Sequence, residues 1–93
     1  MNNPRLKSGF GQVSNDVMRD PDLSLKDKGL YAYLATYASS DNNDTYVSVS
    51  RMAEDCGVTV ATIKRSIDIL TKKGIINRVH RGKGESKRTF LLK

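Results

Sequence analysis

The sequence predicts an α+β fold, with a core of three helices followed by a C-terminal β-hairpin. Apolar residues recur at three- and four-residue spacing in three segments, and each segment follows a Ser or Thr that can cap a helix. After Gly74 the pattern changes to two extended runs joined by the glycine-containing segment 82–86. A chain of 93 residues has room for one modest core, so we expect a single domain.

The chain before the first long helix is predicted to be mostly irregular. Residues 1–9 are polar and interrupted by Pro and Gly, so we expect a flexible N-terminal arm and a folded domain over residues 10–93. Residues 10–13 are predicted to form a short strand or an extended lead-in. Residues 15–19 are predicted to form a helical turn that ends before Pro21.

The first long helix is predicted over residues 25–38. Ser24 can cap it, and Asp27 lies three residues further on, where the helix dipole favours an acid. Gly29 should cost roughly 1 kcal/mol relative to Ala inside a helix, so we expect another backbone to pass close to it. The buried stripe is predicted to comprise Leu30, Tyr33, Leu34 and Tyr37. The polar run 39–45 then predicts a loop.

The second helix is predicted after a short extended piece, Tyr46 and Val47. Ser48 can cap this helix, and its apolar positions fall at i, i+3, i+4 and i+7: Val49, Met52, Ala53 and Cys56. Cys56 therefore lies on the core face, where we interpret it as a small buried hydrophobe. The alternative is a reactive thiol, which needs neighbours that lower its pKa, and the sequence identifies none.

The third helix, predicted over residues 60–73, follows a sharp turn at Gly57. Thr59 can cap its start, and Gly74 suits a left-handed exit at its end. At ~100° per residue, its core side comprises Val60, Ile63, Ile67 and Leu70. The opposite side comprises Ala61, Arg65, Asp68 and Lys72, flanked by Thr62 and Lys64.

The hairpin strands are predicted over residues 75–81 and 87–92. Val79, Phe90 and Leu92 are expected to cover the helices from one side. Two glycines in the connecting loop keep it low and adaptable, so that the basic residues around it can meet a phosphate backbone.

Positive charge is concentrated in the C-terminal part of the chain. Residues 59–93 hold ten Lys or Arg against two acids, whereas residues 1–58 hold six against eight. A localised basic surface indicates a polyanionic partner. Two helices joined by a tight turn, the second with a small, polar and basic face, fit the major groove of DNA. The sequence therefore predicts a protein that binds double-stranded DNA.

We predict contacts of three kinds with the DNA. Base edges are read by Thr59, Ala61, Thr62 and Arg65, with Arg65 as the bidentate reader of guanine. Phosphates are bound by helix starts and basic side chains, namely Ser48, Ser50, Arg51, Lys64 and Lys72. The hairpin contributes Arg81, Lys83, Lys87 and Arg88 to the backbone or the minor groove.

Three residues near this surface each admit two interpretations. Asp68 is repelled by phosphates unless it accepts from cytosine or is neutralised by Lys64 and Lys72, four residues to either side. Ile69 falls outside the core stripe and either packs against the hairpin or a partner chain, or is singly exposed. His80 either contacts a phosphate or base, or is a semi-exposed strand residue.

The pattern Met52, Ala53, Gly57, Val58 and Ile63 resembles the helix-turn-helix signature, and KKGII with the following hairpin resembles its winged variant. From about residue 10 to residue 93, the chain is similar to the N-terminal winged-helix domains of plasmid replication initiators, phage replisome organisers and related primosomal proteins. The resemblance implies a winged helix-turn-helix that binds double-stranded DNA sequence-specifically in plasmid, phage or mobile-element replication initiation. Ser66 departs from the pattern, since many such motifs place a larger apolar residue there, so packing should depend more on Ile67 and Leu70.

Two alternatives remain within this fold: a transcriptional regulator, and a winged helix that binds proteins within a primosome. One 93-residue module is expected to bind a half-site only weakly, which suggests a homodimer or other replication proteins as partners. RNA binding is less favoured, because no aromatic platform interleaves the basic residues.

Enzyme chemistry is not indicated. The sequence has no nucleophile and base at motif spacing and no phosphate-cradling glycine loop. One Cys and one His cannot build a protein-only zinc site in a monomer, so we expect neither a metal nor a cofactor. The single Cys and the absence of an apolar run of membrane-spanning length predict a cytoplasmic protein, with no membrane partner and no small-molecule ligand.

Overall fold

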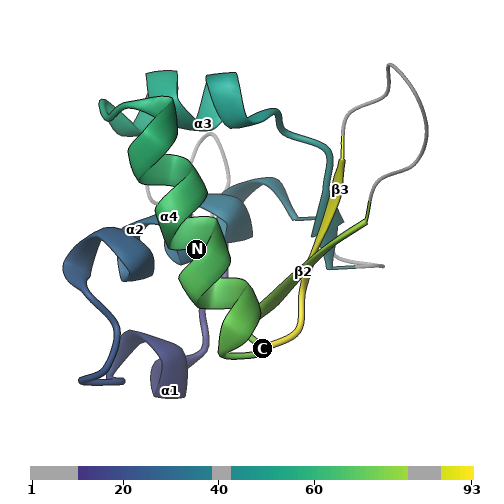
Figure 1. Cartoon of the computed structure of the whole chain (residues 1–93). Helices are drawn as coiled ribbons and strands as arrows, with labels where there is room; N and C mark the ends of the chain where they lie inside the picture. The colour runs from purple at the N-terminus through teal and green to yellow at the C-terminus, as the bar shows by residue number, and fades with distance from the viewer. Residues whose placement is uncertain (1–10, 39–42, 80–86) are drawn as a thin grey trace, which may run out of the picture.

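The computed structural model describes residues 11–38, 43–79 and 87–93 (Figure 1). In chain order these residues form α1 (Asn15–Met18), α2 (Leu25–Tyr37), β1 (Asp44–Thr45), α3 (Val49–Cys56), α4 (Val60–Lys72), β2 (Ile76–Val79) and β3 (Arg88–Leu91). The three strands form one antiparallel sheet in the order β1-β3-β2. The predicted α+β class is confirmed. Within the described ranges, no helix is long and apolar enough to cross a membrane.

The helix boundaries follow the caps that the sequence predicts. Ser24 and Asp27 form a reciprocal capping box at the start of α2, in which each side chain accepts from the backbone N–H of the other. Ser48 accepts from the backbone N–H of Arg51, and Thr59 accepts in the same way at the start of α4. These local signals confirm all three predicted N-caps.

The buried side of α2 differs from the prediction by two residues. Tyr37 is 44% exposed and Tyr33 is only partly buried at the edge of the core, whereas Tyr31 is fully buried. The prediction was wrong because the hydroxyls of Tyr33 and Tyr37 reach the carboxylate of Asp55 at the surface of α3. Leu30 and Leu34 are buried as expected, and the complete buried set of α2 is Asp27, Leu30, Tyr31, Leu34 and Ala35.

The core side of α4 is largely as predicted. Ile63, Ile67 and Leu70 are buried as expected. Val60 is instead 39% exposed, so its assignment to the core side was wrong. Ser66 takes a buried position that faces α2.

In the two hairpin strands, the residues that face the core are the opposite set from the one predicted. Ile76 pairs with Leu91 and both are buried, whereas Val79 and Leu92 are exposed and Phe90 is only partly buried. Since side chains alternate between the two faces of a strand, an error of one residue exchanges the faces completely. The exit from α4, where the N–H of Ile75 donates to the carbonyl of Leu70, sets the register that the sequence pattern did not reveal.

The loop predicted over residues 39–45 contains a short strand at its end. Asp44 pairs with Phe90 and Thr45 with Thr89, so β1 is an edge strand of the sheet. The extended piece was expected two residues later, at Tyr46 and Val47. Residues 39–42 lie outside the described ranges, as do the predicted arm and Phe10.

The glycine that another backbone approaches closely is Gly11, not Gly29. A Cβ atom on Gly11 would lie 2.7 Å from the carbonyl oxygen of Ala35, whereas a Cβ on Gly29 would meet nothing within 4 Å. The expectation for Gly29 was therefore wrong. The lead-in of residues 11–14 has no regular secondary structure and passes directly against α2.

The hydroxyl of Tyr31 joins three distant parts of the chain. It accepts from the backbone N–H of Ser14 at 2.9 Å and donates to the carbonyl oxygen of Lys93 at 2.8 Å. Both partners are backbone groups, which lose their hydrogen bonds if the hydroxyl is removed. Tyr31 thus fixes the lead-in and the segment after β3 to the middle of α2.

Replacement of Gly29 and of Gly11 by Ala should have opposite effects on stability. Gly29→Ala should raise the free energy of unfolding by about 0.5 to 1 kcal/mol, because it lowers the backbone entropy of the unfolded chain at a helical position with open surroundings. Gly11→Ala should lower it by about 1 to 3 kcal/mol, because the new methyl group meets the backbone of α2. Urea unfolding followed by circular dichroism measures both, and a loss for Gly29→Ala would contradict the open surroundings of that residue.

Tyr31→Phe should lower the free energy of unfolding by about 2 kcal/mol, since two backbone groups lose a partner. Tyr37→Phe is the matched control, because its hydroxyl bonds to Asp55 at the surface and its removal should cost less than about 0.5 kcal/mol. The same unfolding experiment compares the two variants. Equal losses of unfolding free energy in the two variants would show that the buried hydrogen bonds of the Tyr31 hydroxyl do not stabilise the fold.

Candidate nucleic-acid interface

The α3–Gly57–α4 unit positions the candidate interface. Gly57 adopts φ 69°, a left-handed conformation, and the N–H of Val58 donates to the carbonyl of Ala53. Glycine is the residue that reaches this conformation without strain, so it closes the turn between the two helices. Because Ile63 and Leu70 bury one side of α4, its other side faces solvent.

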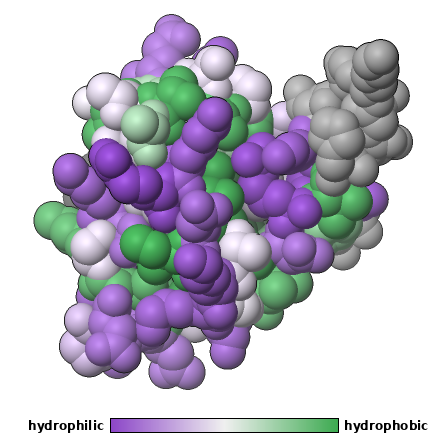
Figure 2. Space-filling view, viewed as in Figure 1, coloured by the Kyte–Doolittle hydropathy of each residue, from purple (hydrophilic) through white to green (hydrophobic). Residues whose placement is uncertain are grey.

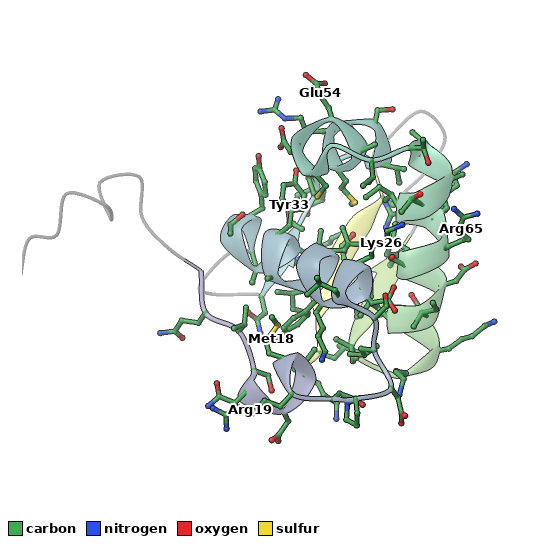
Figure 3. The ribbon with its side chains drawn as sticks, turned by 90° about the vertical axis from the view of Figure 1, so that its left-hand side faces the viewer. Met18, Arg19, Lys26, Tyr33, Glu54 and Arg65 are labelled. Atoms are coloured by element: carbon green, nitrogen blue, oxygen red, sulfur yellow. The ribbon has the colours of Figure 1, made fainter. Side chains whose placement is uncertain are left out.

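We define the solvent face of α4 as Ala61, Arg65, Asp68 and Lys72, all of which are exposed. The structure thus brings three of the predicted contact residues, Ala61, Arg65 and Lys72, onto one surface. Figure 3 shows Arg65 pointing away from the helices. Figure 2 shows hydrophilic residues gathered over α4. Ile69 lies beside this face and is 39% exposed.

A chain of hydroxyl contacts holds Arg65 at the start of α4. Thr59 Oγ1 accepts from the backbone N–H of Thr62 and lies 3.0 Å from Thr62 Oγ1. Thr62 Oγ1 in turn accepts from Nη2 of Arg65 at 3.3 Å. Three of the four predicted base-reading residues are therefore linked to one another within the helix.

A cleft of 460 Å³ opens between the start of α3, α4 and the sheet. We call it the α4–β2 cleft, and its lining residues are Ser48, Val49, Lys64, Ile67, Asp68, Arg78 and Lys87. It collects predicted contact residues from three separate segments, Ser48, Lys64 and Lys87. Asp68 belongs both to the cleft and to the solvent face of α4, and among the described residues it forms no ion pair with Lys64 or Lys72.

Arg78 is a basic residue of the cleft that sequence reasoning missed. It is partly buried, and its Nε donates to Oγ1 of the fully buried Thr89 at 3.1 Å. Burial lowers the pKa of Arg78 from its ordinary value. Alternation along the strand places Arg78 on the same face as Ile76, but only the pairing of β2 with β3 shows that this face is turned to the helices.

Arg88 lies on the other face of the sheet, where it has partners within the chain. Its Nε donates to Asp44, whose side chain is only 5% exposed. Its guanidinium also lies 4.5 Å from the ring centroid of Phe90 and 5.7 Å from that of Tyr46. Arg88 therefore compensates a buried carboxylate, while Lys87 beside it is directed to the α4–β2 cleft.

Arg51 also has a partner within the chain. Its Nε lies 3.1 Å from Oδ2 of Asp55, which also accepts from the hydroxyls of Tyr33 and Tyr37. The hydrogen bonds from Tyr33 and Arg51 lower the pKa of Asp55, and the bond to Asp55 raises the pKa of Arg51. This cluster joins α3 to α2 and does not line the α4–β2 cleft.

Several other predictions concern single residues. Ser50 is exposed in the first turn of α3. Burial raises the pKa of Cys56, which is the opposite of what a reactive thiol needs, and the side chain packs against the core as expected. His80, Arg81 and Lys83 lie outside the described residues, and elsewhere no group of three or more metal-ligating side chains is present.

The fold and this surface define the class: a winged helix-turn-helix, in which α3 and α4 form the motif and β2 and β3 form the base of the wing. The chain belongs to the helix-turn-helix domain family, whose match covers residues 22–76. This result confirms the helix-turn-helix seen in the sequence.

Two solved structures share the fold. One, described as "N-Terminal domain of DNA binding protein", is 18% identical, has a TM-score of 0.70, and is matched over 100% of this chain and 85% of that one. The other, "Structure of Rep-DNA complex", is also 18% identical, has a TM-score of 0.69, and is matched over 97% of this chain and 79% of that one. A comparison with curated proteins gives no match.

Replacing Arg88 should affect stability strongly. Arg88→Gln should lower the free energy of unfolding by about 2 kcal/mol or more, because it leaves the carboxylate of Asp44 buried without its cation. Lys87→Gln, the adjacent control, should leave stability within about 0.5 kcal/mol, because Lys87 is exposed. Thermal and urea unfolding measure both variants, and equal stabilities would show that Asp44 does not depend on Arg88.

Proposed function

We propose that this chain binds double-stranded DNA sequence-specifically, with α4 in the major groove. The observation that carries the proposal is the solvent face of α4, where Arg65 projects from a helix whose opposite side is fixed in the core. A rigidly seated helix with a small residue, Ala61, and a forked donor on its exposed side suits contact with base edges. The net charge of +8 over residues 59–93 supplies the attraction to phosphate.

Each predicted residue then has a role in this complex. Arg65 donates two hydrogen bonds to guanine, and Ala61 approaches a thymine methyl group. Thr59 and Thr62 support these contacts at the start of α4 and complete the base-reading set. Phosphates are contacted by Ser48, Ser50, Arg51, Lys64 and Lys72 on the helices, and by Arg81, Lys83 and Lys87 on the wing. Arg88, which was also predicted to contact DNA, instead stabilises the base of the wing through its pairing with Asp44.

Within DNA binding, the proposal favours replication initiation for a plasmid, phage or other mobile element. It is supported by the sequence resemblance to initiator domains and by the fold shared with a structure described as a Rep-DNA complex. A transcriptional regulator of the same fold is the alternative. The two are separated by where the selected DNA motif occurs, since an initiator site recurs within a replication origin and a regulator site lies at promoters.

A protein-binding role within a primosome has one observation in its favour. Leu25 is 86% exposed at the start of α2 and lines an apolar groove with Val58 and Ile63. Such a groove can accept a partner. Salt-dependent binding of duplex DNA would show that protein binding is not the sole role.

We expect Arg65→Ala to lower affinity for the selected site by about 1 to 3 kcal/mol and to relax preference at one base pair, since a bidentate contact is lost. Selection from a random duplex pool followed by sequencing, with wild type and variant at two salt concentrations, measures this effect. Lys72→Ala is the control, because a phosphate contact on the same face should weaken all sequences alike.

An unchanged site preference in Arg65→Ala would show that α4 docks differently. Binding without any enriched motif would remove sequence specificity from the proposal, and an absence of binding would remove DNA as the partner. The same material tests assembly, because a half-site is expected to be bound weakly by one copy and tightly only by a homodimer, on tandem sites, or with other replication proteins.

A further inference from the structure

We propose that the α4–β2 cleft binds one backbone phosphate of the bound duplex, with Arg78 as its central ligand. This inference rests on the proposed function and deepens it. It assigns a role to a residue that is neither on the solvent face of α4 nor near the tip of the wing. It also commits to one chemical group, a phosphodiester, at one place in the fold.

The charges of the cleft favour the binding of an anion. Among the described residues that line it, three are cationic, Lys64 from α4, Arg78 from β2 and Lys87 directly before β3, and one is a carboxylate, Asp68. They come from three separate segments, so folding brings like charges together in a space of 460 Å³. Like charges that converge without a matching number of acids are stabilised by a bound anion.

The guanidinium of Arg78 is preorganised for such a ligand. Its Nε is bound to Thr89 on the neighbouring strand, which fixes the guanidinium plane, and its terminal nitrogens have no partner among the residues that the structure describes. An arginine fork with one edge anchored presents its other donors in a defined direction, which suits the oxygens of a phosphate. Burial already weakens its hydration, so a phosphate replaces little water there.

The start of α3 completes the ligand set. Ser48 Oγ accepts from the N–H of Arg51, which leaves its own O–H free to donate into the cleft. The N–H group of Val49, which also lines the cleft, is in the first turn of α3, where a helix offers its own backbone no acceptor. Neutral donors and cations from four segments therefore converge on the same space.

The position of the cleft explains why the ligand belongs to a duplex. Lys64 and Asp68 line the cleft from the same helix that carries Arg65. In the view of Figure 2, hydrophilic residues continue from α4 toward the sheet. When α4 lies in a major groove, the phosphates that border the groove pass alongside the helix. One of them then meets the cleft, and Asp68 at its rim disfavours a second.

The test compares Arg78→Gln with wild type on the selected site and on a random duplex over a series of salt concentrations. Removing one phosphate contact should weaken both duplexes by about tenfold and reduce the slope of log affinity against log salt by about 0.9. Duplexes in which single phosphates are replaced by neutral methylphosphonate locate the contact. One such replacement should weaken wild type and leave Arg78→Gln unaffected.

Arg19→Gln is the matched control, because Arg19 is exposed near α1, at the opposite end of the molecule from α3 (Figure 3). It should leave the salt slope unchanged. Lys87→Gln is a second cleft variant at an exposed position and keeps the test valid if Arg78→Gln does not fold.

The possible results separate the two proposals. A salt slope that stays at the wild-type value in both cleft variants, with the same methylphosphonate profile, overturns the phosphate site and leaves sequence-specific binding standing. An Arg78→Gln effect confined to the selected site overturns it as well, since a phosphate contact acts on all sequences. If wild type binds no duplex, the proposed function fails and the phosphate site fails with it.

Discussion

The structure depends on how α4 packs against the other helices and the sheet. Leu70 is fully buried and Ile63 is 2% exposed, and the helix contacts α2, α3 and β2 along its length. Burial of each large aliphatic side chain contributes about 1.5 to 3 kcal/mol, so this stripe alone is a large part of the stability of so small a domain. The same packing fixes the rotation of the helix about its axis. That rotation decides which residues face solvent, and hence that Ala61 and Arg65 do.

In the sheet, the register of the strands likewise decides which side chains are available to a ligand. Arg78 and Arg88 are on neighbouring strands but on opposite faces, because Arg78 pairs with Thr89 and Arg88 pairs with Val79. One arginine therefore points to the α4–β2 cleft, while the other is bound to Asp44. Their chemistry is identical, and the register alone separates a cation available to a ligand from one that the fold uses. A shift of the register by one residue would exchange them and also expose Ile76.

The sequence predicted what depends on local interactions. The caps at Ser24, Ser48 and Thr59, the left-handed turn at Gly57 and the extent of each helix all follow from residues within one or two turns. The exposed side of α4 followed as well, because one strongly periodic helix needs no knowledge of its neighbours. The three N-caps and the solvent face of α4 are therefore encoded by short stretches of sequence.

What the sequence missed depends on contacts between distant segments. Tyr31 and Tyr33 differ by two positions on the same helix, and only the partners Ser14 and Lys93 show which one is inside. The face of Arg78 depended on the register of β2 with β3, which a short alternating segment specifies weakly. Pairing of Arg88 with Asp44 joins residues 44 apart in sequence. No pattern along the chain contains such information.

Local contacts at the start of α4 bear on how Arg65 would bind a base under the proposed function. Its guanidinium already has a partner in Thr62, at 3.3 Å, and Thr62 is held by the cap at Thr59. A single exposed hydrogen bond is worth less than a bidentate arginine–guanine pair, about 1 to 3 kcal/mol, so exchange of Thr62 for guanine is favourable. At a base pair without guanine, Arg65 keeps its bond to Thr62 and gains nothing by leaving it. The bond to Thr62 would therefore subtract its own small worth from the gain at guanine, while it holds the guanidinium at the start of α4 wherever no base contact forms.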